Sequence, residues 1–373
     1  AYEGHYCVGH EAFIKASELV DGLCLLHKSK PELTREENWF FRLTNYTKKI
    51  KENIESGRMR IVPETRVGEI MNLLDDAEDV SFSRPSAQLS WGIPVPDDDT
   101  QTMYVWADAL TNYISALGYG LAPSALAPSP LTPNNLMSVY WPADVHLIGK
   151  DITRFHAIFW PAMLMSAGLE VPKHIYIHGF ITVDGEKMSK TLGNVVDPFE
   201  LLDRYPIELI RYFMLRELRS TDDSDFSYKN LESRYTTDLA NGLGNLVQRV
   251  ATLIATTQKG VVPTATAPEH REALKELLDD TEYHRAFEQF RLHDAVAAVW
   301  AKVGLANAYL NQQEPWKQEG DQQRSTLAIA AAMVAHVAWL LQPVMPASAD
   351  AIRTICSNIS HKTPTPLFPR RDF

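Results

Sequence analysis

Two lysines stand three positions apart, at Lys187 and Lys190, shortly after the turn signal Asp184-Gly185. Ammonium groups on a glycine-flanked loop can be held against a triphosphate, where they neutralise the charge that develops when the α-phosphate is attacked. Such a pair alone also fits a solvated turn, because lysine side chains are mostly exposed. Here the pair follows a predicted strand that ends at His178 and precedes a predicted helix start at Asp197, so we favour a phosphate-binding loop.

A second group of chemically useful residues stands near the first residues of the chain. Cys7 and His10 form one close pair, Cys24 and His27 form another, and thirteen residues separate the pairs. This is the spacing of a zinc knuckle, in which each pair supplies two ligands to a tetrahedral Zn²⁺. Cysteine and histidine also occur together by chance, but the complete four-ligand spacing predicts a structural zinc.

Polar side chains on one predicted helix face form a third group. Asn241, Asn245 and Arg249 follow one another at four-residue intervals, which places two amides and a guanidinium on one stripe. Trp316 ends another predicted helix and offers an indole on which an unstacked base can rest, because proteins usually read RNA sequence in single-stranded loops. Asn241 equally fits a role in fastening its helix to a neighbour, so the pattern leaves both readings open.

The charge distribution leaves room for an RNA partner. The net charge of -11 argues against one, because RNA binding depends on Lys and Arg that neutralise phosphates. The surplus lies wholly in residues 1–228, which hold 21 basic and 32 acidic residues, whereas residues 229–373 hold 15 of each. The second part is therefore neutral and can accept RNA locally.

The composition is that of a globular protein. A chain of 373 residues that is 45% hydrophobic can bury more than one core, so we expect two or three domains. Three cysteines are too few for a disulfide scaffold, and we expect a reducing compartment: the cytoplasm or, as an alternative, the mitochondrial matrix. The apolar run 328–341 contains His336 and precedes Pro343, so we expect no membrane partner. The sequence does not indicate an oligomeric state.

The elements that must position these residues change in kind along the chain. The sequence of residues 1–34 predicts a small irregular module that needs a bound metal to hold it together. Residues 35–205 predict helices and short strands of a parallel α/β sheet, and residues 229–373 predict a helical bundle, reached through a linking segment at 206–228. In the α/β part we expect a helix face from Trp39 and Phe40 to Ile50, a helix from Pro63, and helices from about Trp106 and Ile152. The expected strands lie near 80–83, 145–148 and 175–177. After these we expect long helices at 207–218, 228–257, 284–310 and 322–341.

The lysine loop resembles the second signature of the class I aminoacyl-tRNA synthetases. Residues 187–190 read Lys-Met-Ser-Lys, followed by Thr191 where the signature usually has serine; this change keeps the hydroxyl. Residues 104–113 and 149–163 resemble segments of one member family, the methionyl-tRNA synthetases. This resemblance implies a partial Rossmann-type catalytic sheet with a zinc-knuckle insertion, followed by a helical anticodon-binding domain.

The resemblance also implies roles for particular residues. Lys187 and Lys190 would be catalytic, and the ATP-binding residues would be Gly149, Asp151, His178, Lys187, Ser189 and Lys190. The methionine-binding residues would be Arg84, Trp106, Ala109, Tyr113, Asp151, Phe155, His156 and Trp160, with the Tyr113 hydroxyl offered to the thioether. Aromatic rings suit a thioether, although Trp and Phe at these spacings also fit a core. The anticodon would be read by Asn241, Asn245, Arg249 and Trp316, and zinc would be bound although His10 stands where relatives have cysteine.

The expected function is that of a methionine-tRNA ligase, which uses ATP and Mg²⁺ to activate L-methionine and transfers it to the 3′ end of methionine tRNA. The first class I signature, of the His-Ile-Gly-His type, is absent from the sequence. We therefore expect the N-terminal part of the catalytic domain to be missing, and the chain by itself to be inactive. The alternatives are a tRNA-binding relative without catalysis and one piece of a split synthetase.

Overall fold

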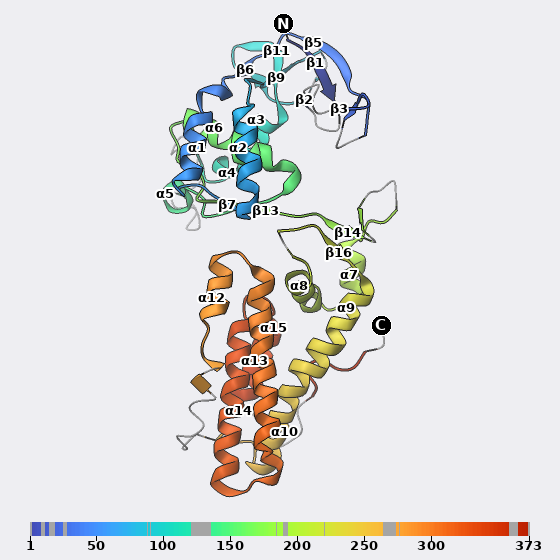
Figure 1. Ribbon diagram of the computed structural model, residues 1–373, viewed down its shortest axis with the longest axis vertical. Coiled ribbons are helices and arrows are strands. Elements are labelled where there is room, and N and C mark those ends of the chain that lie inside the picture. Colours follow the sequence, from blue (N-terminus) through green and yellow to red (C-terminus); the bar gives the residue numbers. More distant parts are fainter. Residues whose placement is uncertain are drawn as a thin grey trace. The chain divides into compact units, whose positions relative to one another are not determined.

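The computed structural model describes residues 2–8, 12–14, 19–24, 28–87, 89, 91–120, 136–183, 185–188, 193–219, 221–263, 274–275, 277–357 and 365–371. The chain forms two compact units, Ala1–Ile177 and His178–Phe373, and Figure 1 labels the elements of both. Each unit has its own buried apolar core. The helical segments and the sheet segments that hold the candidate sites can therefore be described unit by unit.

Unit 1 begins with a small antiparallel sheet. Strand β1 (Tyr2–Cys7) lies between β2 (Ala12–Ile14) and β5 (Glu32–Glu36), and β3 (Leu19–Val20) pairs with β4 (Leu23–Cys24). The sequence analysis expected an irregular module here, and that expectation was wrong. Backbone pairing between β1 and β5 extends over five residues of each strand, so hydrogen bonds order much of this segment.

Two amphipathic helices follow in unit 1. Helix α1 (Thr47–Glu55) buries Ile50 and Ile54, and α2 (Val67–Asp75) buries Ile70 and Leu74. Each pair is four residues apart, which puts both side chains on the face that meets the core. The helix expected from Pro63 is confirmed, with a 3₁₀ turn at Glu64–Arg66 before α2.

The aromatic residues before α1 do not belong to it. Phe40 and Phe41 form strand β6 (Phe40–Phe41), which pairs with β8 (Val80–Ser81), whereas the sequence analysis placed Phe40 on the helix face. The Phe41 ring stacks on Phe82 at a centroid distance of 5.0 Å and on Tyr46 at 5.6 Å. The apolar residues of this segment are therefore used for strand pairing and ring stacking, although their spacing also matches the period of a helix.

The central sheet of unit 1 has the order β12-β13-β7, from β12 (His146–Gly149), β13 (His174–His178) and β7 (Arg60–Val62). Strand β13 is parallel to β7, and Ile61, Ile148 and Ile175 are buried, as expected for an α/β sheet. A second, antiparallel sheet joins β10 (Pro94–Val95), β11 (Asp98–Met103) and β9 (Ser83–Pro85). Short helices complete unit 1: α3 (Val105–Ala109), α4 (Asn112–Ser115), α5 (Leu136–Tyr140), a 3₁₀ turn at Lys150–Ile152, a π-helix at Phe155–Phe159 and α6 (Trp160–Ser166).

Unit 2 opens with a three-stranded sheet and two helices. Strand β14 (Ile181–Val183) lies between β15 (Glu186–Lys187) and β16 (Ser224–Phe226), and it is parallel to β16. Helix α7 (Pro198–Arg204) starts where the Asp197 carboxylate accepts a hydrogen bond from the Phe199 backbone N–H at 2.8 Å. Helix α8 (Ile207–Arg216) follows, so the linking segment expected at 206–228 contains a helix and a strand of this sheet.

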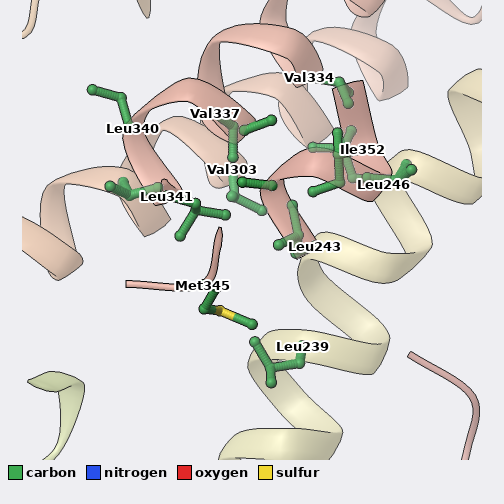
Figure 2. Close-up of a cluster of buried hydrophobic side chains, with 14 of the residues drawn as sticks. Leu239, Leu243, Leu246, Val303, Val334, Val337, Leu340, Leu341, Met345 and Ile352 are labelled. Atoms are coloured by element: carbon green, nitrogen blue, oxygen red, sulfur yellow. The ribbon is translucent and has the colours of Figure 1, made fainter. Parts of the chain in front are cut away.

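Most of the remaining described residues of unit 2 are helical. One long helical path runs through α9 (Tyr228–Arg234), a π-helix at Tyr235–Gly244 and α10 (Asn245–Thr257). It is followed by α12 (Thr281–Glu288), α13 (Leu292–Gln313), α14 (Gly320–Leu341) and α15 (Pro346–Ser357). Figure 2 shows Leu239, Leu243 and Leu246 of the long path beside apolar side chains of α13, α14 and α15. Each such fully buried side chain contributes roughly 1.5–3 kcal/mol, so the bundle has a large core.

The helix expected at 284–310 is interrupted in the structure. Helix α12 ends at Glu288, Phe290 adopts a left-handed φ of 58°, and α13 begins at Leu292. The Arg291 guanidinium pairs with Glu282 across this break. A local left-handed residue cannot be read from apolar periodicity, which continues through the turn.

Helix α14 is long and apolar enough to cross a membrane by length and composition. However, 72% of its apolar stretch is buried inside the helical bundle. That burial is typical of the core helix of a globular domain.

Candidate functional sites

An aromatic cluster in unit 1 collects five of the predicted methionine-binding residues. Trp106 of α3 stacks on Phe155, with ring centroids 4.0 Å apart and an interplanar angle of 8°. The Trp106 ring also lies edge-to-face with His156, at a centroid distance of 6.1 Å, and Phe155 packs edge-on against Phe159. Offset and edge-to-face ring pairs of this kind are favourable beyond their area. These contacts join α3 to the π-helix.

A hydrogen bond fixes the protonation of His156. Its Nδ1 lies 3.1 Å from the Ile152 carbonyl oxygen, which can only accept, so Nδ1 carries the hydrogen. Burial lowers the pKa of His156, so the ring is neutral near pH 7 and Nε2 is an acceptor. The Tyr113 hydroxyl, 2.9 Å from Nε2, must therefore donate to it.

This arrangement bears on the role expected for Tyr113, which stays a prediction. The sequence analysis offered its hydroxyl to the methionine thioether, but in the structure the hydroxyl hydrogen is used by His156. Only the oxygen lone pairs and the ring of Tyr113 then remain for a ligand. Burial raises the pKa of this phenol, which keeps it protonated.

A second neutral histidine supports the cluster. The Trp160 indole N–H donates to Nε2 of His146 at 3.1 Å, and the Tyr113 ring lies 4.3 Å from the His146 ring. Burial, followed by the nearby His156, lowers the pKa of His146 to about 4. Trp141 packs edge-on against Trp160, with ring centroids 6.0 Å apart. His146 and Trp141 were not predicted from the sequence, although a histidine that opens the short strand before Gly149 was a usable signal.

A π-helix sets the spacing of these side chains. The Trp160 backbone N–H bonds to the carbonyl of Phe155, five residues back, where an α-helix would bond four residues back. His156, Phe159 and Trp160 are all buried as a result. Short π-helical turns of this kind often occur at functional sites.

The other predicted residues of unit 1 lie outside this set of contacts. Gly149 ends β12 and Asp151 is exposed on the following 3₁₀ turn, while Ala109 is exposed at the end of α3. Arg84 is 7% exposed; its guanidinium donates to the Ser83 carbonyl oxygen at 2.7 Å and lies 4.8 Å from the centroid of the Tyr104 ring. Its methionine-binding role stays a prediction.

The base of the lysine loop is held in unit 2. The Asp225 carboxylate accepts from the Thr182 hydroxyl and from the Gly185 backbone N–H, both at 2.8 Å. Gly179, next to the exposed His178, allows no side chain, because a Cβ there would lie 2.1 Å from the Asp222 carbonyl oxygen. Ser189, Lys190 and the Lys187 side chain lie outside the described residues.

An exposed surface in unit 2 joins Arg249 to Trp316. The Arg249 guanidinium lies 5.5 Å from the centroid of the Trp316 ring, within range of a cation–π contact. Its Nη2 donates to the Asn311 side-chain oxygen at 2.9 Å. Asn241 and Asn245 are exposed on the same helical path. The sequence analysis chose Arg249 and Trp316 separately; the structure brings them together and adds Asn311, which no sequence pattern marked.

A short turn presents Trp316 to solvent. Helix α13 ends at Gln313, Glu314 adopts a left-handed φ of 46°, and Pro315–Lys317 form one 3₁₀ turn. The buried Gln323 amide of α14 donates to the carbonyl oxygens of Pro315 at 2.9 Å and Gln318 at 2.8 Å. Trp316 is 47% exposed on this anchored turn.

The predicted zinc ligands are described only in part. Cys7 and Cys24 are buried in one small cluster with Ile14, while His10 and His27 lie outside the described residues. Within the ranges that the structure describes, no group of three or more His, Cys, Asp or Glu side chains could hold a metal ion. The zinc site therefore stays a prediction.

Known families match both parts of the chain. Residues 1–251 match the family described as tRNA synthetases class I (M), and residues 261–367 match the anticodon binding domain of methionyl tRNA ligase. The chain belongs to the methionyl-tRNA synthetases. It is 39% identical over 400 residues to the methionine-tRNA ligase of Brucella melitensis, a match that covers 99% of this chain and 75% of the relative. It is 40% identical over 366 residues to that of Mycobacterium tuberculosis, covering 94% of this chain and 68% of the relative.

Solved structures of synthetases share this fold. The crystal structure of Mycobacterium tuberculosis methionyl-tRNA synthetase bound by methionyl-adenylate matches with a TM-score of 0.87 and 37% identity, over 99% of this chain and 76% of that one. The apo form of the same synthetase matches with a TM-score of 0.86. The family expected from the lysine loop and the aromatic segments is thereby confirmed.

Proposed function

We propose that this chain carries the methionine-binding and tRNA-binding parts of a methionine-tRNA ligase, with methionine held at the aromatic cluster of unit 1. The observation that carries this assignment is the pair of neutral, hydrogen-bonded histidines among stacked rings. Such surroundings favour an uncharged, polarisable side chain, because sulfur–ring contacts contribute roughly 0.3–1.5 kcal/mol each. Charged side chains are disfavoured there by desolvation.

ATP, which would bind with Mg²⁺, supplies the adenylyl group: a methionine carboxylate oxygen would bond to the α-phosphorus while the bond from that phosphorus to pyrophosphate breaks. For this step we assign Gly149 and Asp151 to the adenylate, and His178, Lys187, Ser189 and Lys190 to the phosphates. The charge that develops on the phosphates would be neutralised by the two lysines, which is the largest kind of contribution in reactions of this type. Support for the loop assignment comes from the anchored loop base at Asp225.

For tRNA we assign the anticodon to Asn241, Asn245, Arg249 and Trp316. The exposure of Asn241, Asn245 and Trp316, and the contact of the half-buried Arg249 with Trp316, support this assignment. A stacking surface and a guanidinium suit an unstacked base of a single-stranded loop.

For the N-terminal module we propose one zinc ion held by Cys7, His10, Cys24 and His27. The two thiols are buried in the same cluster, which fits their use as paired ligands. Metal analysis of the purified protein should find about one zinc per chain. Removal of the metal should lower the thermal stability of this module, and an unchanged melting curve in a zinc-free sample would refute the assignment.

The main proposal is tested by methionine-dependent pyrophosphate exchange in the natural full-length protein. Replacing Trp106 by Ala should raise KM for methionine while KM for ATP changes little, because the indole faces the amino-acid site. Trp91 is 75% exposed and lies outside the aromatic cluster, so Trp91→Ala is the matched control. Equal effects of both variants on methionine KM, or equal losses for both substrates, would contradict the assignment.

A further inference from the structure

Three residues from three elements meet at the exposed surface of unit 2. Arg249 comes from α10, Asn311 from the last turn of α13, and Trp316 from the 3₁₀ turn that follows. The guanidinium is held twice, by the Asn311 side-chain oxygen at 2.9 Å and by the Trp316 ring at 5.5 Å. A long arginine side chain on a surface is otherwise mobile, so this double contact orders it.

We propose that Asn311 is a positioning residue for RNA reading: it fixes the Arg249 guanidinium over one face of Trp316 and leaves the other face of the indole for one base. This inference rests on the anticodon-binding role proposed above for Arg249 and Trp316. Asn311 itself need not contact the RNA. Its effect passes through Arg249.

The distance between guanidinium and ring limits how a base can bind. A base inserted between them would need two stacking gaps of about 3.5 Å each. The observed 5.5 Å leaves no room for that arrangement. A single base must therefore stack on the face of Trp316 that Arg249 leaves open, consistent with the 47% exposure of this residue.

The chemistry of Asn311 suits this purpose better than a carboxylate would. Its amide oxygen uses one of the five guanidinium N–H donors and leaves the positive charge of Arg249 uncompensated for RNA. The carboxylate of Glu314, on the adjoining turn, is paired with Lys317 at 2.8 Å. In a helical region without a net positive charge, one uncompensated guanidinium is a substantial share of what attracts phosphates.

The test uses the full-length protein with two methionine tRNAs, one carrying the CAU anticodon and one carrying another. Asn311→Ala should raise KM for the CAU tRNA about three- to tenfold, as expected for loss of one hydrogen bond, with kcat and pyrophosphate exchange unchanged. Asn311→Asp should weaken tRNA binding and lower its salt dependence by about one released ion, because the new carboxylate compensates Arg249. Gln312 is exposed one position further on the same helix, so Gln312→Ala and Gln312→Asp are the matched controls.

A double variant separates positioning from a merely structural effect. If Asn311 acts through Arg249, then adding Asn311→Ala to Arg249→Ala should cause no further loss of tRNA affinity. Additive losses would overturn the inference, as would an Asn311→Ala variant that behaves like Gln312→Ala. A wild-type protein that does not distinguish the two anticodons would instead remove the proposed anticodon function. Loss of Arg249 or Trp316 that lowers discrimination, with no effect of Asn311, would retain that function and reject only the positioning role.

Discussion

The aromatic cluster of unit 1 and the Arg249–Trp316 surface of unit 2 use tryptophan in opposite ways. Trp160 is 1% exposed and donates its indole N–H to a buried histidine, whereas Trp316 is 47% exposed and keeps one ring face open. In a dry cluster each hydrogen bond is strong and each missing partner costs stability. On a wet surface the same ring contributes less to folding, and its open face can be used for binding. Stability and recognition should therefore be coupled in unit 1 and separable in unit 2.

The largest effect should follow removal of a buried ring. Trp160→Ala should lower the free energy of unfolding of unit 1 by about 3–5 kcal/mol, the usual cost of a large cavity in a core. Urea denaturation followed by tryptophan fluorescence measures this loss. Trp316→Ala is the matched change in unit 2 and should cost clearly less, about 1–2 kcal/mol, because roughly half of this ring is already exposed. Similar losses in the two variants would break the comparison.

The buried histidines should make the stability of unit 1 depend on pH. The pKa of His146 is about 4 in the folded chain and 6.5 in the reference state, so the unfolded chain binds more protons between these values. The stabilisation from neutral His146 is therefore present above pH 6.5 and is lost as pH falls towards 4, by roughly 3 kcal/mol in total. The lowered pKa of His156 acts in the same direction.

Denaturation curves between pH 4 and pH 7 would measure this dependence. His146→Gln keeps an acceptor for the Trp160 indole but does not titrate, so its pH dependence should be weaker than that of the wild type. Identical slopes for the two proteins would show that His146 does not bury a neutral ring.

The exposed surface should show a large effect on recognition with only a small effect on stability. Trp316→Ala removes a stacking surface that contributes roughly 1–3 kcal/mol, so aminoacylation of methionine tRNA should fall by about ten- to a hundredfold. Adenylate formation needs no tRNA and should hardly change. If tRNA carrying another anticodon is rejected as strongly by the variant as by the wild type, Trp316 is not a reading residue.

The smallest expected effect comes from one hydroxyl. Tyr113→Phe leaves the buried Nε2 of His156 without its donor, which should cost about 1–3 kcal/mol of unit 1 stability, near the lower end because Tyr113 is half-buried. KM for methionine should rise together with this loss, since both depend on the same ring. A higher KM with unchanged stability would mean that the hydroxyl contacts the ligand and not His156.

The sequence predicted the elements with strong periods and missed what depends on distant neighbours. Helices α2 and α10 were found because their apolar residues repeat along one face. Phe40 was placed on a helix because its strand partner Ser81 lies far away along the chain and cannot be inferred from local spacing. The break at Phe290 was missed because a single left-handed residue leaves apolar periodicity intact.

The candidate sites were predictable to the extent that single side chains carry the signal. Trp106 and Arg249 were chosen for their chemistry, and the structure places an aromatic ring beside each of them. His146 and Asn311 were missed because each acts through a residue on another element. The hydrogen of Tyr113 could be assigned only after its distance to His156 and the Ile152 carbonyl were known. The lysine loop and the zinc ligands stay predictions.

The π-helix at Tyr235–Gly244 bears on how the length of this segment can change. Its hydrogen bonds span five residues, so loss of one residue there could convert a turn to ordinary α-helix while α9 and α10 keep their rotation. A deletion within α10 (Asn245–Thr257) before Arg249 would instead rotate every later side chain by about 100° and carry the guanidinium away from Trp316. Single-residue deletions should therefore be tolerated within the π-helix and selected against in the part of α10 that precedes Arg249.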